Sequence, residues 1–166
     1  MQSRETTIMT TDLRRWITLC ERWETLPRLF HGTCQHDLPI IRQRGLEAQP
    51  TKPKGGAVRH GVYLTDDYHT ADEYGFLACD QRGGGEVIIL EIDARQLDIK
   101  LLQPDDYDLQ DAIQGGERAG SEPVDPRLRH LHHWSEASWQ LSLEMTHQVF
   151  YAGSIPVAAI TVLDAS

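Results

Sequence analysis

The feature that most constrains the fold is a run of six residues, Val87–Ile92, in which Glu91 alone is polar. A short uninterrupted run of β-branched and aliphatic residues is typical of a strand buried inside a sheet. This segment is the strongest central-strand candidate in the chain. Four further strand candidates accompany it: Arg28–Thr33 with a break at Gly32, Val62–Leu64, Gln148–Tyr151 and Ala159–Leu163.

Helical patterns in the chain are brief. From Asp12 to Leu26, apolar residues recur at steps of three and four, which predicts an amphipathic helix that ends at Pro27. Further short helices are expected at Leu38–Arg44, from Thr70 as N-cap to about Ala78, and at Trp134–Leu143. Short strands and brief helices without regular alternation favour an α+β domain.

The length of 166 residues suits one domain with its own core. We expect residues 28–166 to form this domain and residues 1–27 to be a helical extension packed on it. The segment Pro50–Gly61 combines prolines and glycines with three basic residues, Lys52, Lys54 and Arg59, which predicts an exposed basic loop.

A second long connection, Gln103–Arg129, is polar and rich in glycine and proline. We expect it to run over the surface, and it is too long to be a passive connector. Its carboxylates include Asp105, Asp106, Asp108 and Asp111.

The charge of the chain restricts its partners. Lys and Arg number 16 against 25 Asp and Glu, which gives a net charge of −9. A surface with this balance repels a polyanion unless basic residues are gathered locally. Nonspecific coating of nucleic acid is therefore not expected.

The cysteines bear on the cellular compartment. Cys20, Cys34 and Cys79 form no C-x-x-C pair, and their odd number is typical of buried or free thiols in a reducing compartment. The first eleven residues contain no apolar core of a signal peptide, and the longest apolar runs are too short to span a bilayer. We expect a cytoplasmic protein that does not enter a membrane.

Three separated segments share a pattern with a known enzyme superfamily. They are Leu29–Thr33 followed by Ile40–Leu46, then Gly61–Asp66 followed by Thr70, Ala71 and Tyr74, and finally Gln148–Pro156. In order and spacing they resemble the ADP-ribosyltransferase superfamily of the diphtheria-toxin and poly(ADP-ribose) polymerase type, over roughly residues 28–163. The resemblance implies an ADP-ribosyltransferase-like split β-sandwich with short flanking helices, and a site signature of His, Tyr and Glu on three strands.

The resemblance also implies a site for NAD as co-substrate. Cleavage of the nicotinamide–ribose bond passes through an oxocarbenium-like centre, so the site must hold nicotinamide and ribose and stabilise positive charge at C1′. By this resemblance, His31 hydrogen-bonds the adenosine ribose, the Gly32 backbone holds the nicotinamide amide, and Thr33 braces the turn after them. Tyr63 stacks on the nicotinamide ring, Thr70 hydrogen-bonds the nicotinamide amide, and Tyr74 forms the wall of the site opposite Tyr63. A side chain at Gly32 would block the ligand.

Where the superfamily has its catalytic glutamate, this chain has Gln148. A glutamine can accept a ribose hydrogen bond but brings no negative charge, and losing such an electrostatic contribution costs ~10²–10³ in rate. Three explanations stand: an engineered Glu-to-Gln change that attenuates a toxic enzyme, a natural variant with weak or altered activity, or another acid. Glu144 is the nearest substitute, with Glu136 behind it.

These expectations define two functions. The first is a cytoplasmic NAD-dependent mono-ADP-ribosyltransferase, of the bacterial or phage-related toxin kind, that modifies a macromolecule, with protein favoured over nucleic acid and with an antitoxin as a partner. The alternative is an inactive module that binds NAD, ADP-ribose or a partner. No metal is expected, because His130, His132 and His133, with His147 nearby, lack the spacing of a metal site.

Overall fold

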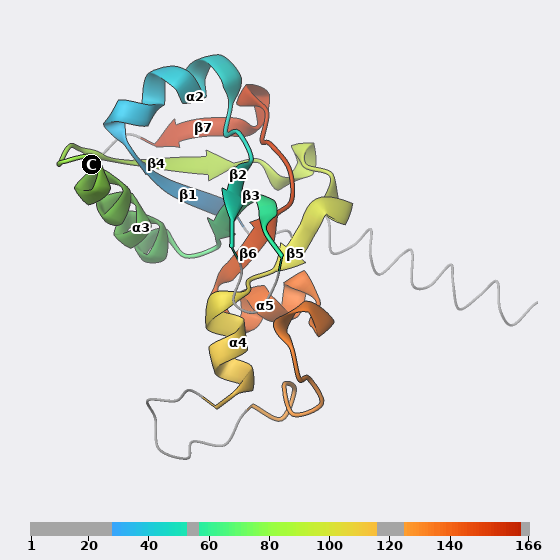
Figure 1. Cartoon of the computed structure of the whole chain (residues 1–166). Helices are drawn as coiled ribbons and strands as arrows, with labels where there is room; N and C mark the ends of the chain where they lie inside the picture. Colours follow the sequence, from blue (N-terminus) through green and yellow to red (C-terminus); the bar gives the residue numbers. More distant parts are fainter. Residues whose placement is uncertain (1–27, 53–56, 116–124, 164–166) are drawn as a thin grey trace, which may run out of the picture.

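A computed structural model describes residues 28–52, 57–115 and 125–163. It is an α+β structure built on one antiparallel sheet, in the strand order β5-β6-β3-β1-β4-β7, with β2 paired to the outer part of β3 (Figure 1). The strands are β1 (Leu29–Cys34), β2 (Gln49–Thr51), β3 (Arg59–Thr65), β4 (Val87–Ile92), β5 (Leu102–Pro104), β6 (Gln148–Tyr151) and β7 (Ile160–Leu163). The α-helices are α2 (Leu38–Arg44), α3 (Tyr68–Gln81), α4 (Tyr107–Ile113) and α5 (Trp139–Thr146).

The predicted central strand is confirmed: β4 spans Val87–Ile92 and lies between β1 and β7. β1 pairs with β4 over its whole length, from Leu29 opposite Ile92 to Cys34 opposite Val87. Its pairing with β3 on the other edge is limited to Phe30 opposite Thr65. The two strands therefore separate beyond this point, and the sheet opens between β1 and β3.

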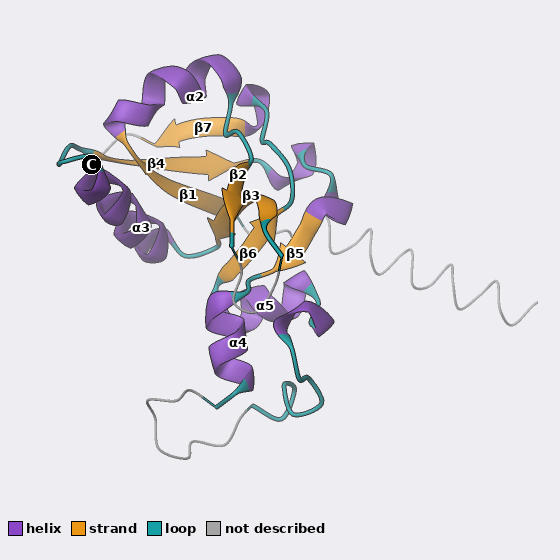
Figure 2. Ribbon diagram, viewed as in Figure 1, coloured by secondary structure: helices purple, strands orange, loops and turns teal. Residues whose placement is uncertain are grey.

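Helix α3 packs against β1 and β4, and its backbone comes close to the backbone of β1 (Figure 2). A Cβ atom added at Gly32 would lie 1.7 Å from the carbonyl oxygen of Ala71 and 2.6 Å from the backbone nitrogen of Gly75. Gly32 does not end β1, as the sequence suggested, but lies inside the strand. Its lack of a side chain lets strand and helix approach each other.

A disulfide between Cys34 and Cys79 joins β1 to α3. Both residues are buried, as expected, but the expectation of free thiols is wrong for this pair because the strand and the helix bring them together. Disulfides are rare in cytosolic proteins. The cysteines therefore no longer support a reducing compartment. Cys20 lies outside the described residues.

The predicted surface excursion from Gln103 to Arg129 is wrong for its first part, where the chain completes β5 and then forms α4. Residues 107–113 form α4, whose apolar side is buried with the turn Trp134–Glu136 and α5 (Figure 2). The buried members of this cluster are Leu109, Ile113, Leu128, Leu131 and Trp134. Leu109 and Ile113 are four residues apart and so lie on the same helix face, a spacing that the surrounding polar residues obscured. A second core, built on the sheet, contains Leu29, Leu64, Leu90 and Val149.

Several predicted boundaries shift. The helix at Leu38–Arg44 is confirmed, and the helix expected at Trp134–Leu143 begins as a 3-10 turn before α5. Thr70 is not the N-cap of α3, because the Asp67 side chain accepts the hydrogen bond from the Thr70 backbone N–H at 2.8 Å. The expected loop Pro50–Gly61 contains part of β2 and the start of β3.

The helix expected at Asp12–Leu26, the extension 1–27 and Lys54 lie outside the described residues. Within the described ranges, no helix is long and apolar enough to cross a membrane.

Candidate functional site

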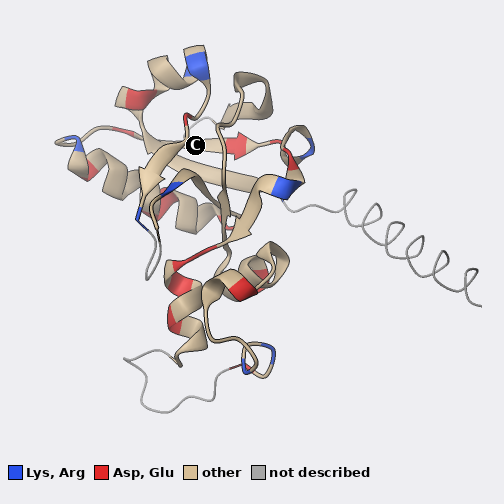
Figure 3. Cartoon of the chain, turned by 45° about the vertical axis from the view of Figure 1, so that its right-hand side comes forward, with Lys and Arg blue, Asp and Glu red and all other residues tan. Residues whose placement is uncertain are grey.

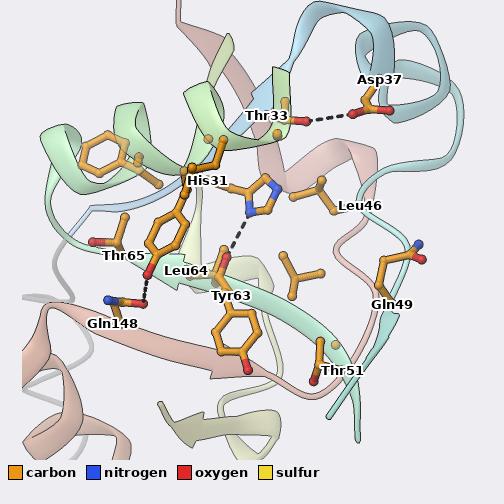
Figure 4. Close-up of a pocket in the computed structure, with 18 of the residues that line it drawn as sticks. His31, Thr33, Asp37, Leu46, Gln49, Thr51, Tyr63, Leu64, Thr65 and Gln148 are labelled. Atoms are coloured by element: carbon orange, nitrogen blue, oxygen red, sulfur yellow. Dashed lines mark hydrogen bonds between the residues drawn. The ribbon is translucent and has the colours of Figure 1, made fainter. Parts of the chain in front are cut away.

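A cavity of about 930 Å³ opens where β1 and β3 separate (Figure 4). Its wall comes from β1, α2, β2, β3, α3, the start of α4, and β6. Ligand pockets are commonly about 300–1,000 Å³ and largely apolar with a few polar groups. Six of the predicted site residues line this cavity: His31, Gly32, Thr33, Tyr63, Tyr74 and Gln148. Thr70 and Glu144 are not part of its wall.

The His31 side chain occupies the gap between the two strands. Its Nδ1 lies 3.0 Å from the backbone carbonyl oxygen of Tyr63 (Figure 4). A carbonyl only accepts, so Nδ1 carries the proton and Nε2 is left as an acceptor. Burial lowers the pKa of the His31 imidazole, which keeps the ring neutral at physiological pH. His31 therefore offers the cavity a neutral hydrogen-bond acceptor.

The Tyr63 ring lies on the side of β3 away from the His31 ring (Figure 4). Its hydroxyl donates to Asp106, and its ring packs edge-on against Phe150 with centroids 5.0 Å apart. Burial, with a contribution from the Asp106 hydrogen bond, raises the pKa of the Tyr63 hydroxyl. The structure therefore brings the Tyr63 backbone, but not its ring, next to His31.

Gln148 connects α3 to α4 through its side-chain amide. Its Oε1 accepts a hydrogen bond from the Tyr74 hydroxyl at 3.0 Å, and its Nε2 donates to Asp108 (Figure 4 shows the first contact). The residue is 7% exposed and stands opposite Thr65 in the β3–β6 pair. Burial, followed by the Asp108 charge, raises the pKa of the Tyr74 hydroxyl. Tyr74, Gln148 and Asp108 thus form one polar wall of the cavity.

Glu144 and Thr70 lie outside the cavity wall, and Thr33 and Gly32 have roles within the fold. Glu144 is exposed and bonds Arg127 at 2.8 Å. The Thr70 hydroxyl donates to Asp67 at the start of α3. The Thr33 hydroxyl faces Asp37 at 3.4 Å, in the turn after β1. At Gly32 a side chain would meet α3 itself, so the glycine is required by packing before any ligand is considered.

The carboxylates at the start of α4, which Figure 3 shows as a run of acidic residues, were evident in the sequence, but their place beside the cavity was not. Asp106 is 4% exposed at its side chain and pairs with Arg59 at 2.6 Å. Arg59 was expected in a solvated loop but is 11% exposed at its side chain. Asp105 accepts the backbone N–H of Asp108 at 2.8 Å, and Asp108 lines the cavity. In the sequence the three aspartates resemble surface residues, because no neighbouring residue indicates which distant side chains they contact.

Asp105 makes the stability of the fold depend on pH. Burial raises the pKa of this carboxyl from 3.8 to about 6, partly opposed by its hydrogen bonds from the Leu109 and Asp108 backbones. Because the folded pKa is the higher one, the native state keeps this proton between about pH 4 and pH 6 while the unfolded chain has lost it. The contribution of Asp105 to stability therefore falls as pH rises through this window and stays low above it.

We expect Asp105→Asn to remove this dependence, because asparagine is uncharged and its oxygen can still accept from the α4 backbone. The unfolding free energy of the variant minus that of the wild type should therefore be roughly 3 kcal/mol larger at about pH 7.5 than at about pH 4. Urea denaturation of both proteins at the two pH values measures this difference. An equal difference at both values would contradict the burial of a charged Asp105.

No protein-family model matches the chain, and no curated protein matches it at a significant level. Among the described residues, no group of three or more His, Cys, Asp or Glu side chains is placed to hold a metal ion. Two of the clustered histidines have local partners: His133 contacts Ser135 and His147 contacts Asp66.

Proposed function

We propose that the protein is a mono-ADP-ribosyltransferase that uses NAD as co-substrate. The observation that carries this proposal is convergence: the segments that resemble the superfamily, the first and last of them more than a hundred positions apart, line one cavity through His31, Tyr63 and Gln148. A resemblance by chance would not require these segments to meet. The cavity is also of a size that suits a ligand as large as a nucleotide.

The roles of the residues follow from their positions. The Nε2 of His31 would accept a hydrogen bond from a ribose hydroxyl, and the β1 edge at Gly32 would hold the nicotinamide amide. Tyr74 lines the cavity and is fixed through Gln148, so its ring is the aromatic surface best placed to pack against nicotinamide. Stacking of this kind contributes about 1 kcal/mol beyond area burial.

The acceptor of ADP-ribose is proposed to be a protein. Net charge −9 disfavours a nucleic-acid acceptor, and Arg82, an arginine that lines the cavity, is paired with Asp37 at 2.6 Å. A toxin of this kind, held in check by an antitoxin, is the biological setting that we propose.

One observation favours a second function. Gln148 has both ends of its amide satisfied within the protein, so the site is stable without the superfamily's glutamate. A module that binds NAD or ADP-ribose without cleaving it is the alternative proposal. Binding alone does not separate the two functions, whereas release of nicotinamide does.

The test is NAD binding by calorimetry together with nicotinamide release from labelled NAD. We expect the wild type to bind NAD and His31→Ala to weaken binding by about tenfold or more, as the loss of a hydrogen bond worth about 1.4 kcal/mol implies. His60→Ala is the matched control, because His60 is exposed on β3 and does not line the cavity. Absence of NAD binding by the wild type would remove the transferase, and absence of ADP-ribose binding as well would remove the binding module.

A further inference from the structure

The polarity of the Gln148 amide is fixed by its neighbours. Asp108 is a carboxylate and can only accept, so the Gln148 NH₂ group must face it, and Oε1 is left to accept from Tyr74. A glutamate at position 148 could accept from Tyr74 but would oppose the Asp108 charge. The site is therefore built for an amide on β6 and a carboxylate on α4.

Asp108 differs from the other carboxylates around it. Asp105 also lines the cavity, but it is only 1% exposed, and its Oδ2 accepts two backbone N–H groups at the start of α4, at 2.8 and 3.3 Å. Asp106 is taken by Arg59 and Tyr63 on the far side of β3. Glu144 is exposed and bound to Arg127. Asp108 is half-buried, lines the cavity, and holds Gln148 through Oδ2, which leaves its second oxygen for a ligand.

We propose that Asp108 is the catalytic carboxylate of this site and that Gln148 is its positioning residue, an inference that rests on the proposed NAD-dependent activity. The negative charge missing from β6 is then supplied from α4, across one hydrogen bond. The resemblance to the superfamily pointed to position 148 or its neighbour Glu144, whereas this assignment puts the charge 40 residues earlier in the chain than Gln148.

The step that Asp108 would assist is heterolytic. The bond between C1′ of the ribose and the nicotinamide nitrogen breaks, and its electron pair goes to nitrogen, which neutralises the pyridinium. C1′ gains positive charge, which a nearby carboxylate stabilises. A nucleophilic oxygen or nitrogen of the acceptor, or of water, then bonds to C1′ and gives up its proton, and Asp108 is placed to receive it.

Asp108→Asn tests this inference with little change of shape, because the asparagine oxygen can still accept from Gln148. We expect nicotinamide release to fall by ~10²–10³ while the Kd for NAD changes less than about threefold, since the charge matters only once the bond stretches. Asp72→Asn is the matched control, because Asp72 is an exposed carboxylate on α3 that does not line the cavity. It should leave both quantities unchanged.

A charge exchange separates catalysis from structural support. In the double variant Asp108→Asn with Gln148→Glu, the amide and the carboxylate trade places, and the introduced asparagine amide on α4 can donate to the introduced carboxylate on β6. We expect release to recover to within about tenfold of wild type, because the charge is restored to the same polar wall. Gln148→Glu alone sets two carboxylates in contact, where one retains a proton, and should not raise the rate.

Each outcome decides between the inference and the proposed function. If the wild type binds and cleaves NAD but Asp108→Asn is equally fast, Asp108 is not the acid and the function stands. A gain of about a hundredfold from Gln148→Glu alone would return the acid position to β6 and overturn the inference. If the wild type binds NAD without cleaving it, Asp108 does not act as a catalytic group and the binding module is the better description. If the wild type does not bind NAD, the function and the inference fall together.

Discussion

The Gly32→Ala protein is expected to lose about 3 kcal/mol or more of its unfolding free energy. The added methyl group would sit 1.7 Å from the Ala71 carbonyl oxygen, and the atoms that it meets are backbone atoms of α3, which cannot move by rotating a side chain. The helix has to shift away from β1, so packing is lost along their shared interface. Thermal unfolding should show a fall in Tm of roughly 10 °C.

Gly83→Ala is the matched control for this prediction. A methyl group at Gly83 has no atom within 4 Å, so the only penalty is its backbone φ of +84°. That conformation costs an alanine about 1–2 kcal/mol. If the two variants unfold at the same temperature, close approach of β1 and α3 is not what requires glycine at position 32.

The strands were the most predictable part of the fold. A buried strand is marked by a short apolar run, and Val87–Ile92 has the same bounds in the sequence pattern and in the structure. Helix ends were less predictable, because several polar residues near a helix start can act as caps. Thr70 and Asp67 both qualify by type, and only the geometry shows that Asp67 accepts the hydrogen bond.

Polar residues of the site were predictable only where a known pattern marked them. His31, Tyr74 and Gln148 belong to the segments that resemble the superfamily, and they do line one cavity. Asp108 carries no such mark, because its partner Gln148 is 40 residues away and the contact depends on how α4 packs. The sequence alone does not distinguish a buried aspartate from a solvent-exposed one.

The burial of Arg59, like that of the aspartates, could not be predicted from its neighbours in the sequence. Beside Lys52 and Lys54 it looked like part of a basic loop, yet its guanidinium lies over the Phe150 ring with a Cζ-to-centroid distance of 3.7 Å. The Trp134 ring is 4.6 Å away. An arginine can bury its planar group between aromatic rings when a carboxylate neutralises it. The partners of Arg59 come from three distant parts of the chain, around Asp106, Trp134 and Phe150, so no local sequence pattern predicts this environment.

We expect Arg59→Met to lower the unfolding free energy by about 3–5 kcal/mol, because it leaves the buried Asp106 carboxylate without its cation. The methionine keeps the apolar contacts with Phe150, so the loss reflects the broken Arg59–Asp106 ion pair more than lost packing. Arg59 ties β3 to the region of α4 through Asp106, so we also expect the two core clusters to separate more easily. Urea denaturation followed by tryptophan fluorescence, to which Trp134 contributes, and by circular dichroism measures both effects.

A double-mutant cycle tests whether the charge pair is responsible. Adding Asp106→Asn to Arg59→Met removes the buried negative charge that has lost its arginine, so the double variant should be more stable than the sum of the single changes predicts, by about 2 kcal/mol or more. The exposed pair Arg95–Asp93 is the matched control, and Arg95→Met should cost less than about 1 kcal/mol. Strictly additive effects of Arg59→Met and Asp106→Asn would mean that the two residues contribute independently. In that case the stability of this region would come from the packing of Phe150 and Trp134 around Arg59. The ion pair between Arg59 and Asp106 would then add no stability of its own.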